Sequence, residues 1–71
     1  RGFLYAGASS IVSSLWKVDD GATSLLMQEF YSKLQSTNKR DALRAAQLKL
    51  KAGKYSHPNY WAAFQLTGSV N

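Results

Sequence analysis

The sequence predicts a mixed α/β fold with the order strand, helix, helix, strand. Residues 10–16 and 60–67 are short runs rich in β-branched and aromatic side chains, which favour strands. Between them lie two segments whose apolar residues recur at helical spacing. Helical crossovers usually join parallel strands. We therefore expect the two strands to belong to a largely parallel sheet.

The opening residues 1–8 predict the end of a helix. They are apolar and run into Gly7, a residue type that accepts the left-handed conformation common after a helix C-terminus. A helix needs earlier turns and an N-cap. We therefore expect the protein to extend upstream of Arg1.

The first central helix is predicted to begin after Asp19 and Asp20 and to run to about Ser36. Acidic side chains at this point cap a helix and complement its positive end. The segment carries apolar residues at every fourth position, namely Ala22, Leu26, Phe30 and Leu34. This pattern is typical of a helix that covers a sheet.

The second helix is predicted between Asn38, its expected cap, and Gly53. Pro58 then forbids a continuing helix, so the last strand is expected over residues 60–67. We expect both helices to pack on the sheet through four apolar side chains, Leu26, Phe30, Leu43 and Leu50.

A chain of 71 residues buries only a modest core, and this chain has no cysteine and one histidine with which to form disulfides or a metal site. We expect neither metal nor cofactor. Two strands alone also leave a sheet face and an edge open. The predicted partner is the upstream half of the same domain or another copy of the chain, with Ile11, Val12, Trp61 and Phe64 in the contact.

The formal net charge of +5 raises the possibility of a nucleic-acid or membrane partner, and the pattern argues against both. Arg40, Arg44 and Lys51 share a helical face, but no aromatic residue is interleaved with the basic ones. A solvated helix face explains this arrangement better. No apolar run is long enough for a membrane span. We expect no nucleic acid, no membrane and a cytoplasmic location.

Five blocks of the sequence, in order, resemble the CHAT domain, a family of the caspase and separase type. Together they run over nearly the whole chain, from Phe3 to Gly68. The blocks are Phe3-Leu4-Tyr5-Ala6-Gly7-Ala8, then residues 12–20 (VSSLWKVDD), then Thr23 with Leu26-Met27 and Phe30-Tyr31, then residues 42–47 (ALRAAQ), and finally His57-Pro58 with residues 60–64 (YWAAF).

The resemblance implies that residues 1–71 are the C-terminal portion of a single caspase-like three-layer α/β sandwich, often fused to tetratricopeptide repeats. Peptidase members use a histidine and a cysteine, both in motifs upstream of the matching blocks. Without a thiol this chain alone is not a cysteine peptidase. The function expected is the structural and substrate-pocket portion of such a domain, and the alternative is a non-catalytic interaction or signalling module.

His57 is not assigned as the catalytic histidine. It lies in a turn block distinct from the family's catalytic motif, and we expect it to be a structural, hydrogen-bonding residue. A serine triad with Asp19 or Asp20 has no supporting motif, because no Gly-x-Ser-x-Gly elbow occurs.

The candidate substrate-binding residues are Asp20, Asp19 and Trp16. They follow a strand at the edge where open α/β sheets place ligands. The resemblance implies that this loop helps to wall the pocket for the residue before the scissile bond, with an acidic side chain that binds arginine. Asp20 is the better candidate. Helix capping by either aspartate, and a core role for Trp16, remain open alternatives.

Overall fold

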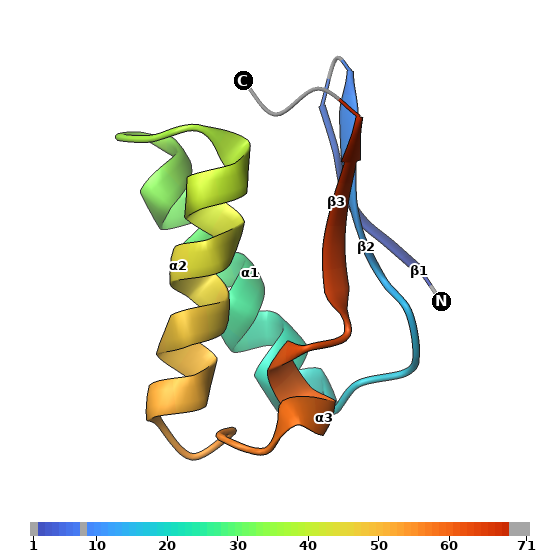
Figure 1. The fold of residues 1–71 in the computed structure, drawn as a ribbon, viewed down its shortest axis with the longest axis vertical. Helices are drawn as coiled ribbons and strands as arrows, with labels where there is room; N and C mark the ends of the chain where they lie inside the picture. The colour runs from blue at the N-terminus through green and yellow to red at the C-terminus, as the bar shows by residue number, and fades with distance from the viewer. Residues whose placement is uncertain (1, 8, 69–71) are drawn as a thin grey trace.

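The chain forms one antiparallel sheet with helices packed against one of its faces (Figure 1). The computed structural model describes residues 2–7 and 9–68. Within them the elements are β1 (Gly2–Ala6), β2 (Ser10–Ser14), α1 (Asp20–Leu34), α2 (Lys39–Ala52), α3 (Pro58–Trp61) and β3 (Phe64–Gly68). The predicted mixed α/β class is confirmed, with an additional strand at the start and a short helix before the last strand.

The segment predicted to end a helix is instead β1, which forms a hairpin with β2. Tyr5 lies opposite Val12, with an irregularity in the register between Phe3 and Tyr5. The Gly7 N–H donates to the Ser10 carbonyl at 2.8 Å, so this glycine closes the hairpin and caps no helix. The prediction was wrong because aromatic residues favour strands and an apolar run of five residues carries no helical period.

The expectation of a parallel sheet was also wrong, since β2 lies between β1 and β3 and pairs with both in antiparallel orientation. The helices explain this. In Figure 1, α1 leads the chain away from the end of β2, and α2 brings it back to the same end. One crossover helix would have started the next strand at the far end, whereas two antiparallel helices return the chain and reverse its direction.

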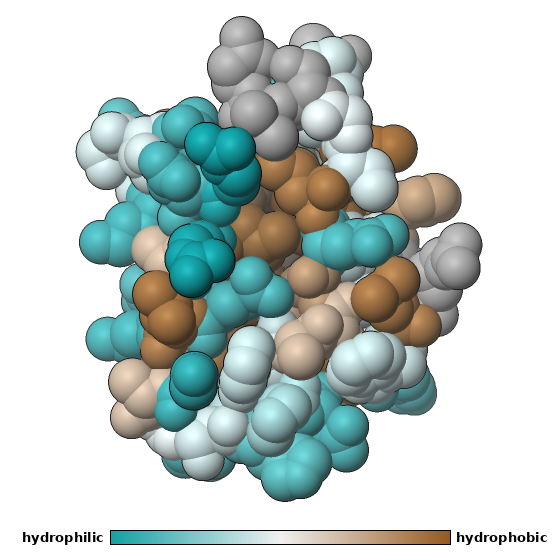
Figure 2. All heavy atoms as spheres, in the orientation of Figure 1, coloured by the Kyte–Doolittle hydropathy of each residue, from teal (hydrophilic) through white to brown (hydrophobic). Residues whose placement is uncertain are grey.

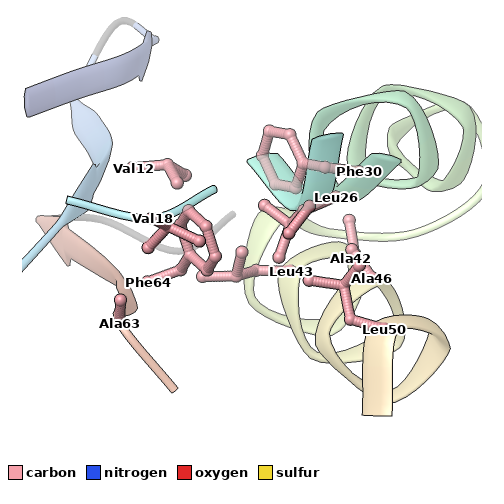
Figure 3. Close-up of a cluster of buried hydrophobic side chains, with 11 residues drawn as sticks. Val12, Val18, Leu26, Phe30, Ala42, Leu43, Ala46, Leu50, Ala63 and Phe64 are labelled. Carbon is pink, nitrogen blue, oxygen red and sulfur yellow. The ribbon is translucent and has the colours of Figure 1, made fainter. Parts of the chain in front are cut away.

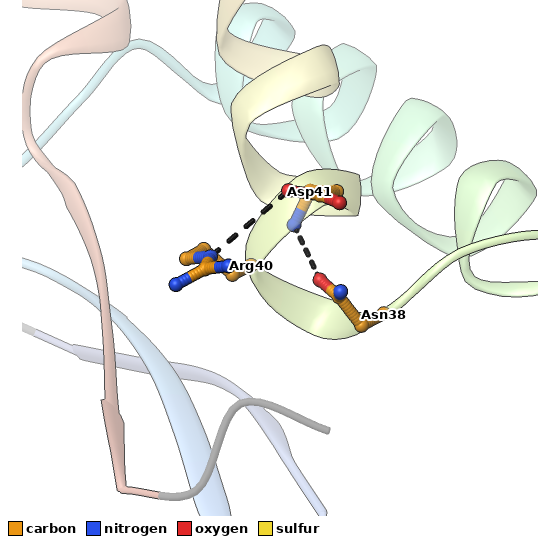
Figure 4. Close-up of polar contacts among 3 residues, drawn as sticks. All are labelled: Asn38, Arg40 and Asp41. Carbon is orange, nitrogen blue, oxygen red and sulfur yellow. Dashed lines mark hydrogen bonds and ion pairs between the residues drawn. The ribbon is translucent and has the colours of Figure 1, made fainter.

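Side-chain caps fix the starts of both long helices, as predicted. The Asp19 carboxylate accepts the Ala22 N–H at 3.2 Å, and the Asn38 side-chain oxygen accepts the Asp41 N–H at 2.8 Å (Figure 4). Gly53 follows the last residue of α2, as predicted, and its N–H donates to the Leu50 carbonyl at 3.1 Å. The two caps satisfy N–H groups that have no partner within their helices.

Tyr60 and Trp61, predicted to begin the last strand, belong instead to α3. Pro58 stands in the first turn of α3, where its missing N–H costs no hydrogen bond. His57 caps the helix, its Nδ1 accepting the Asn59 N–H at 3.1 Å. The proline that forbids a continuing helix therefore starts a new one.

The hydrophobic core lies between the sheet and the two long helices (Figure 3). The four side chains predicted to carry this packing are all buried there, namely Leu26, Phe30, Leu43 and Leu50. Val12 and Phe64, expected in a contact with a partner, are buried in this same core. That part of the expectation was wrong because both side chains point toward the chain's own helices.

The opposite face of the sheet is not covered by a helix among the described residues (Figure 1). Strand alternation places Phe3 and Ile11 on that face, because Val12 points toward the helices. Phe3 is 77% exposed, which is unusual for a phenylalanine in a strand. The helices and the sheet thus form two layers and leave one sheet face open, on which Phe3 and Ile11 lie among Ser13, Gln65 and Thr67.

Replacing Leu50 by alanine should destabilise the fold strongly. Leu50 is fully buried, and truncating such a leucine costs about 2–5 kcal/mol through lost burial and the cavity left behind. Leu48→Ala is the matched control, because Leu48 lies on the same helix and is 53% exposed. Urea denaturation followed by circular dichroism measures both, and equal effects would contradict the described packing.

Candidate functional site

A surface hollow of about 570 Å³ lies beyond the end of β2, where the connection to α1 faces the start of α3. Its lining comes from two segments that are far apart in the sequence: Trp16, Lys17, Val18 and Asp19 from the connection, and His57, Asn59 and Tyr60 from α3 and its cap. We call this hollow the Trp16 pocket. It gathers two of the three predicted site residues, Trp16 and Asp19.

Trp16 joins the two walls of the pocket. Its indole Nε1–H donates to the Asn59 carbonyl at 3.1 Å, a bond across 43 residues of sequence. The side chain is 41% exposed and therefore stands at the pocket and outside the buried core. An aromatic ring fixed by its polar end offers a flat apolar surface to a ligand.

The two aspartates differ in position. Asp19 lines the pocket and caps α1 through one carboxylate oxygen, Oδ2. A carboxylate has capacity for several hydrogen bonds, so the cap leaves acceptor capacity for a ligand. Asp20 is the first residue of α1, is exposed and does not line the pocket. Its assignment as the better substrate-binding candidate remains a prediction.

His57 has the structural role expected of it, because its Nδ1 accepts the Asn59 N–H that begins α3. It also lines the pocket, which sequence reasoning did not foresee, and Asn59 and Tyr60 were missed as well. The available signal was the His-Pro pair, which is typical of a helix start, although it does not indicate what the helix faces. The Tyr60 ring packs against the Tyr55 ring, with ring centroids 5.1 Å apart.

Gln47 is a further residue that sequence reasoning missed. From the middle of α2 its side-chain amide donates to the Trp61 carbonyl at 2.7 Å and to the Phe64 carbonyl at 3.2 Å. These bonds hold α3 and the start of β3 against α2. The available signal was a lone amide among the apolar positions of the helix, since a partly buried amide needs partners.

The pocket carries charges of both signs. Lys17 stands beside Asp19 in the lining, so the wall is not uniformly acidic. Asp20 adds a second carboxylate at the start of α1, where the positive end of the helix stabilises negative charge. Among residues 2–7 and 9–68, no group of three or more His, Cys, Asp or Glu side chains gathers into a metal site.

Comparison with known proteins identifies the family. The model of the CHAT domain matches residues 1–69. The chain belongs to the CHAT domain family. Tetratricopeptide repeat protein 28 of Homo sapiens is 38% identical over 71 residues, and the protein of the same name from Mus musculus is 37% identical. Each comparison covers 97% of this chain. No solved structure matches it.

The chain spans only about 3% of the length of these two relatives. Both relatives are named as tetratricopeptide repeat proteins, which is the association that the resemblance implied. Within the described residues, no helix is both long enough and apolar enough to cross a membrane.

Removing the Asp19 side chain should weaken the fold by about 1 kcal/mol, the usual loss when an N-cap is replaced by alanine. Asp19→Asn should keep most of this stability, because asparagine is an equally good cap. Asp20→Ala is the positional control and should cost less, since Asp19 is the residue that accepts the Ala22 N–H. Thermal unfolding compares the three variants, and a larger loss for Asp20→Ala would contradict this assignment of the cap.

Proposed function

We propose that this chain is the C-terminal structural and substrate-pocket portion of a CHAT cysteine-peptidase domain, and that it is inactive by itself. The observation that carries the proposal is the Trp16 pocket, in which the segment after β2 meets α3. An open hollow with an aromatic wall and a carboxylate is suited to hold one side chain of a peptide. The family match over residues 1–69 supports the peptidase-like setting.

The side chain that the pocket accepts is proposed to be basic. Asp19 in the lining and Asp20 beside it can form charge-assisted hydrogen bonds to a guanidinium group. The Trp16 and Tyr60 rings favour the same ligand, because the face of an aromatic ring attracts a cation. Lys17 opposes it, so the preference depends on the two carboxylates outweighing one ammonium group.

The partner proposed for the open sheet face is the rest of the same domain. Phe3 is largely exposed there, and the relatives are far longer than the matching segment. A layer on this face would complete a three-layer sandwich of the caspase-like kind and would remove the Phe3 side chain from water. The upstream residues would also supply the cysteine and the histidine. We propose a cytoplasmic setting for the complete protein and a protein or peptide as its substrate.

The 71-residue chain alone should cleave no peptide, because it holds no thiol and no motif for another nucleophile. The measurement is release of a fluorescent group from peptides with arginine, lysine or a neutral residue before the scissile bond. Turnover that stays with the chain through repeated purification and a check for contaminating proteases would contradict the proposal.

In the complete parent protein, Asp20→Ala should lower cleavage after arginine and lysine far more than cleavage after neutral residues. Loss of a charge-assisted pair of hydrogen bonds corresponds to about ten-fold or more in kcat/KM for basic substrates. Glu29→Ala is the control, since it removes one negative charge from the same helix away from the pocket.

An equal loss on basic and neutral substrates would assign Asp20 a purely structural role. A parent protein whose upstream region lacks the cysteine and histidine, and which cleaves none of the peptides, would instead support the alternative of a non-catalytic interaction module. Sequencing of that region and the substrate panel together decide between the two.

A further inference from the structure

A second hollow of about 360 Å³ lies between α2 and β3, and it shares no residue with the Trp16 pocket. We call it the α2–β3 groove. Its lining is Arg40, Asp41, Leu43, Arg44 and Gln47 from α2, and Phe64, Gln65 and Leu66 from β3. Figure 2 shows apolar atoms exposed between these two elements, with hydrophilic atoms on either side. The groove thus has an apolar floor and a helical wall that carries two arginines and one aspartate.

The other wall of the groove is the edge strand of the sheet. Within the described residues β3 pairs only with β2. The Leu15 N–H donates to the Ala63 carbonyl, and antiparallel pairs alternate between bonded and non-bonded. This alternation turns the backbone groups of Phe64 and Leu66 toward the outer edge. The Phe64 carbonyl there accepts a bond from Gln47, and Leu66 presents its N–H and carbonyl one step further along.

The helical wall is matched to an extended chain. Arg40 and Arg44 are four residues apart on α2, which is a rise of about 6 Å along a helix. Side chains on one face of a strand repeat every two residues, which is about 6.6 Å. Figure 1 shows α2 running alongside β3. A strand added to the edge of β3 would therefore bring two side chains in register with the two arginines.

Arg40 is available for such a contact. Its closest acidic neighbour is Asp41, with Nε and Oδ1 4.0 Å apart and side chains 68% and 57% exposed. Exposed ion pairs of this length contribute little stability. Figure 4 shows the Arg40 side chain directed away from α2 toward the sheet. A ligand carboxylate can therefore replace Asp41 as its partner at small cost.

From these observations we propose that the α2–β3 groove binds an extended, acidic peptide segment by strand addition. The segment pairs its backbone with the outer edge of β3 at Leu66. Two glutamate side chains in the pattern Glu-x-Glu lie against Arg40 and Arg44, with their methylene groups on Leu43 and Leu66. Main-chain bonds supply affinity in this mode, and the alternate side chains supply specificity.

The test uses the 71-residue chain and a fluorescein-labelled, amidated heptapeptide of threonine and valine with glutamate at positions 3 and 5. Fluorescence polarisation should show saturable binding that weakens as salt is raised. Arg44→Gln and Arg40→Gln should each weaken binding about three-fold, and the double variant about ten-fold, as expected for exposed charge pairs. Lys49→Gln removes one positive charge from the same helix outside the groove and should leave binding unchanged.

Two further probes separate strand addition from charge attraction alone. A peptide with glutamine at positions 3 and 5 should bind about ten-fold more weakly. A glutamate peptide with N-methylated backbone amides on the pairing side should lose binding, because methylation removes the bonds to the strand edge. In amide NMR spectra of the chain, the Leu66 N–H should exchange more slowly when the unmodified peptide is bound.

The proposal is overturned if the glutamate and glutamine peptides bind alike, or if the double arginine variant binds as the native chain does. It is also overturned if no peptide binds up to about 1 mM, the range of the weakest specific complexes. If sedimentation shows that a second copy of the chain occupies the β3 edge and the peptide does not displace it, the occupant is the second copy and the peptide proposal fails. Circular dichroism confirms that each variant is folded.

Discussion

The side-chain amide of Gln47 ties α2 to the place where α3 ends and β3 begins, and both concave surfaces depend on it. Its two bonds reach the carbonyls of Trp61 and Phe64, which flank the bend between these elements. On one side of the bend, α3 supplies Asn59 and Tyr60 to the Trp16 pocket. On the other side, β3 forms a wall of the α2–β3 groove. Removing the Gln47 amide would leave these two carbonyls without this donor. The loss of stability should therefore exceed that of an exposed hydrogen bond.

The antiparallel pair of long helices explains why these surfaces lie where they do. Because α1 and α2 together return the chain to the end of β2 at which it left, α3 comes to rest beside the connection that carries Trp16. The indole bond to the Asn59 carbonyl then closes the contact. A single crossover helix would have put the His-Pro turn at the opposite end of the sheet. The pocket is therefore a consequence of helix number as much as of its lining residues.

Local signals predicted the helical part of this fold well, and they failed where tertiary pairing decides. The caps at Asp19 and Asn38, and the buried faces that include Leu26 and Leu50, follow from spacing and side-chain chemistry within one turn of helix. The prediction for β1 was wrong because a short apolar run ending in glycine fits a helix end and a hairpin equally well. Its identity depends on pairing with β2, which composition does not encode.

The candidate site was only partly predictable, because local signals do not show which distant segments meet in the fold. Trp16 and Asp19 belong to one continuous segment, which its position after a strand and the family resemblance selected together. Asp20, the preferred candidate from the same segment, does not line the pocket. His57, Asn59 and Tyr60 reach the pocket from a distant part of the chain, Asn59 lying 43 residues from Trp16, and no local pattern links them to Trp16. Proline both ends a preceding helix and fits the first turn of a new one, and at Pro58 the second property decides the structure.

The distribution of charge gives the two concave surfaces opposite preferences. The net charge of +5 alone would suggest that anions are favoured everywhere on this small surface. Salt at physiological ionic strength screens the interaction between exposed charges beyond about 8 Å. The ligand that a hollow attracts therefore depends on the charged groups within it. Asp19 lines the Trp16 pocket and Asp20 follows it at the start of α1, whereas Arg40 and Arg44 line the α2–β3 groove together with Asp41. Capping places acidic residues at helix starts, whereas basic residues lie along exposed helix faces. A chain that is basic overall can therefore hold a cation in one hollow and a carboxylate in another.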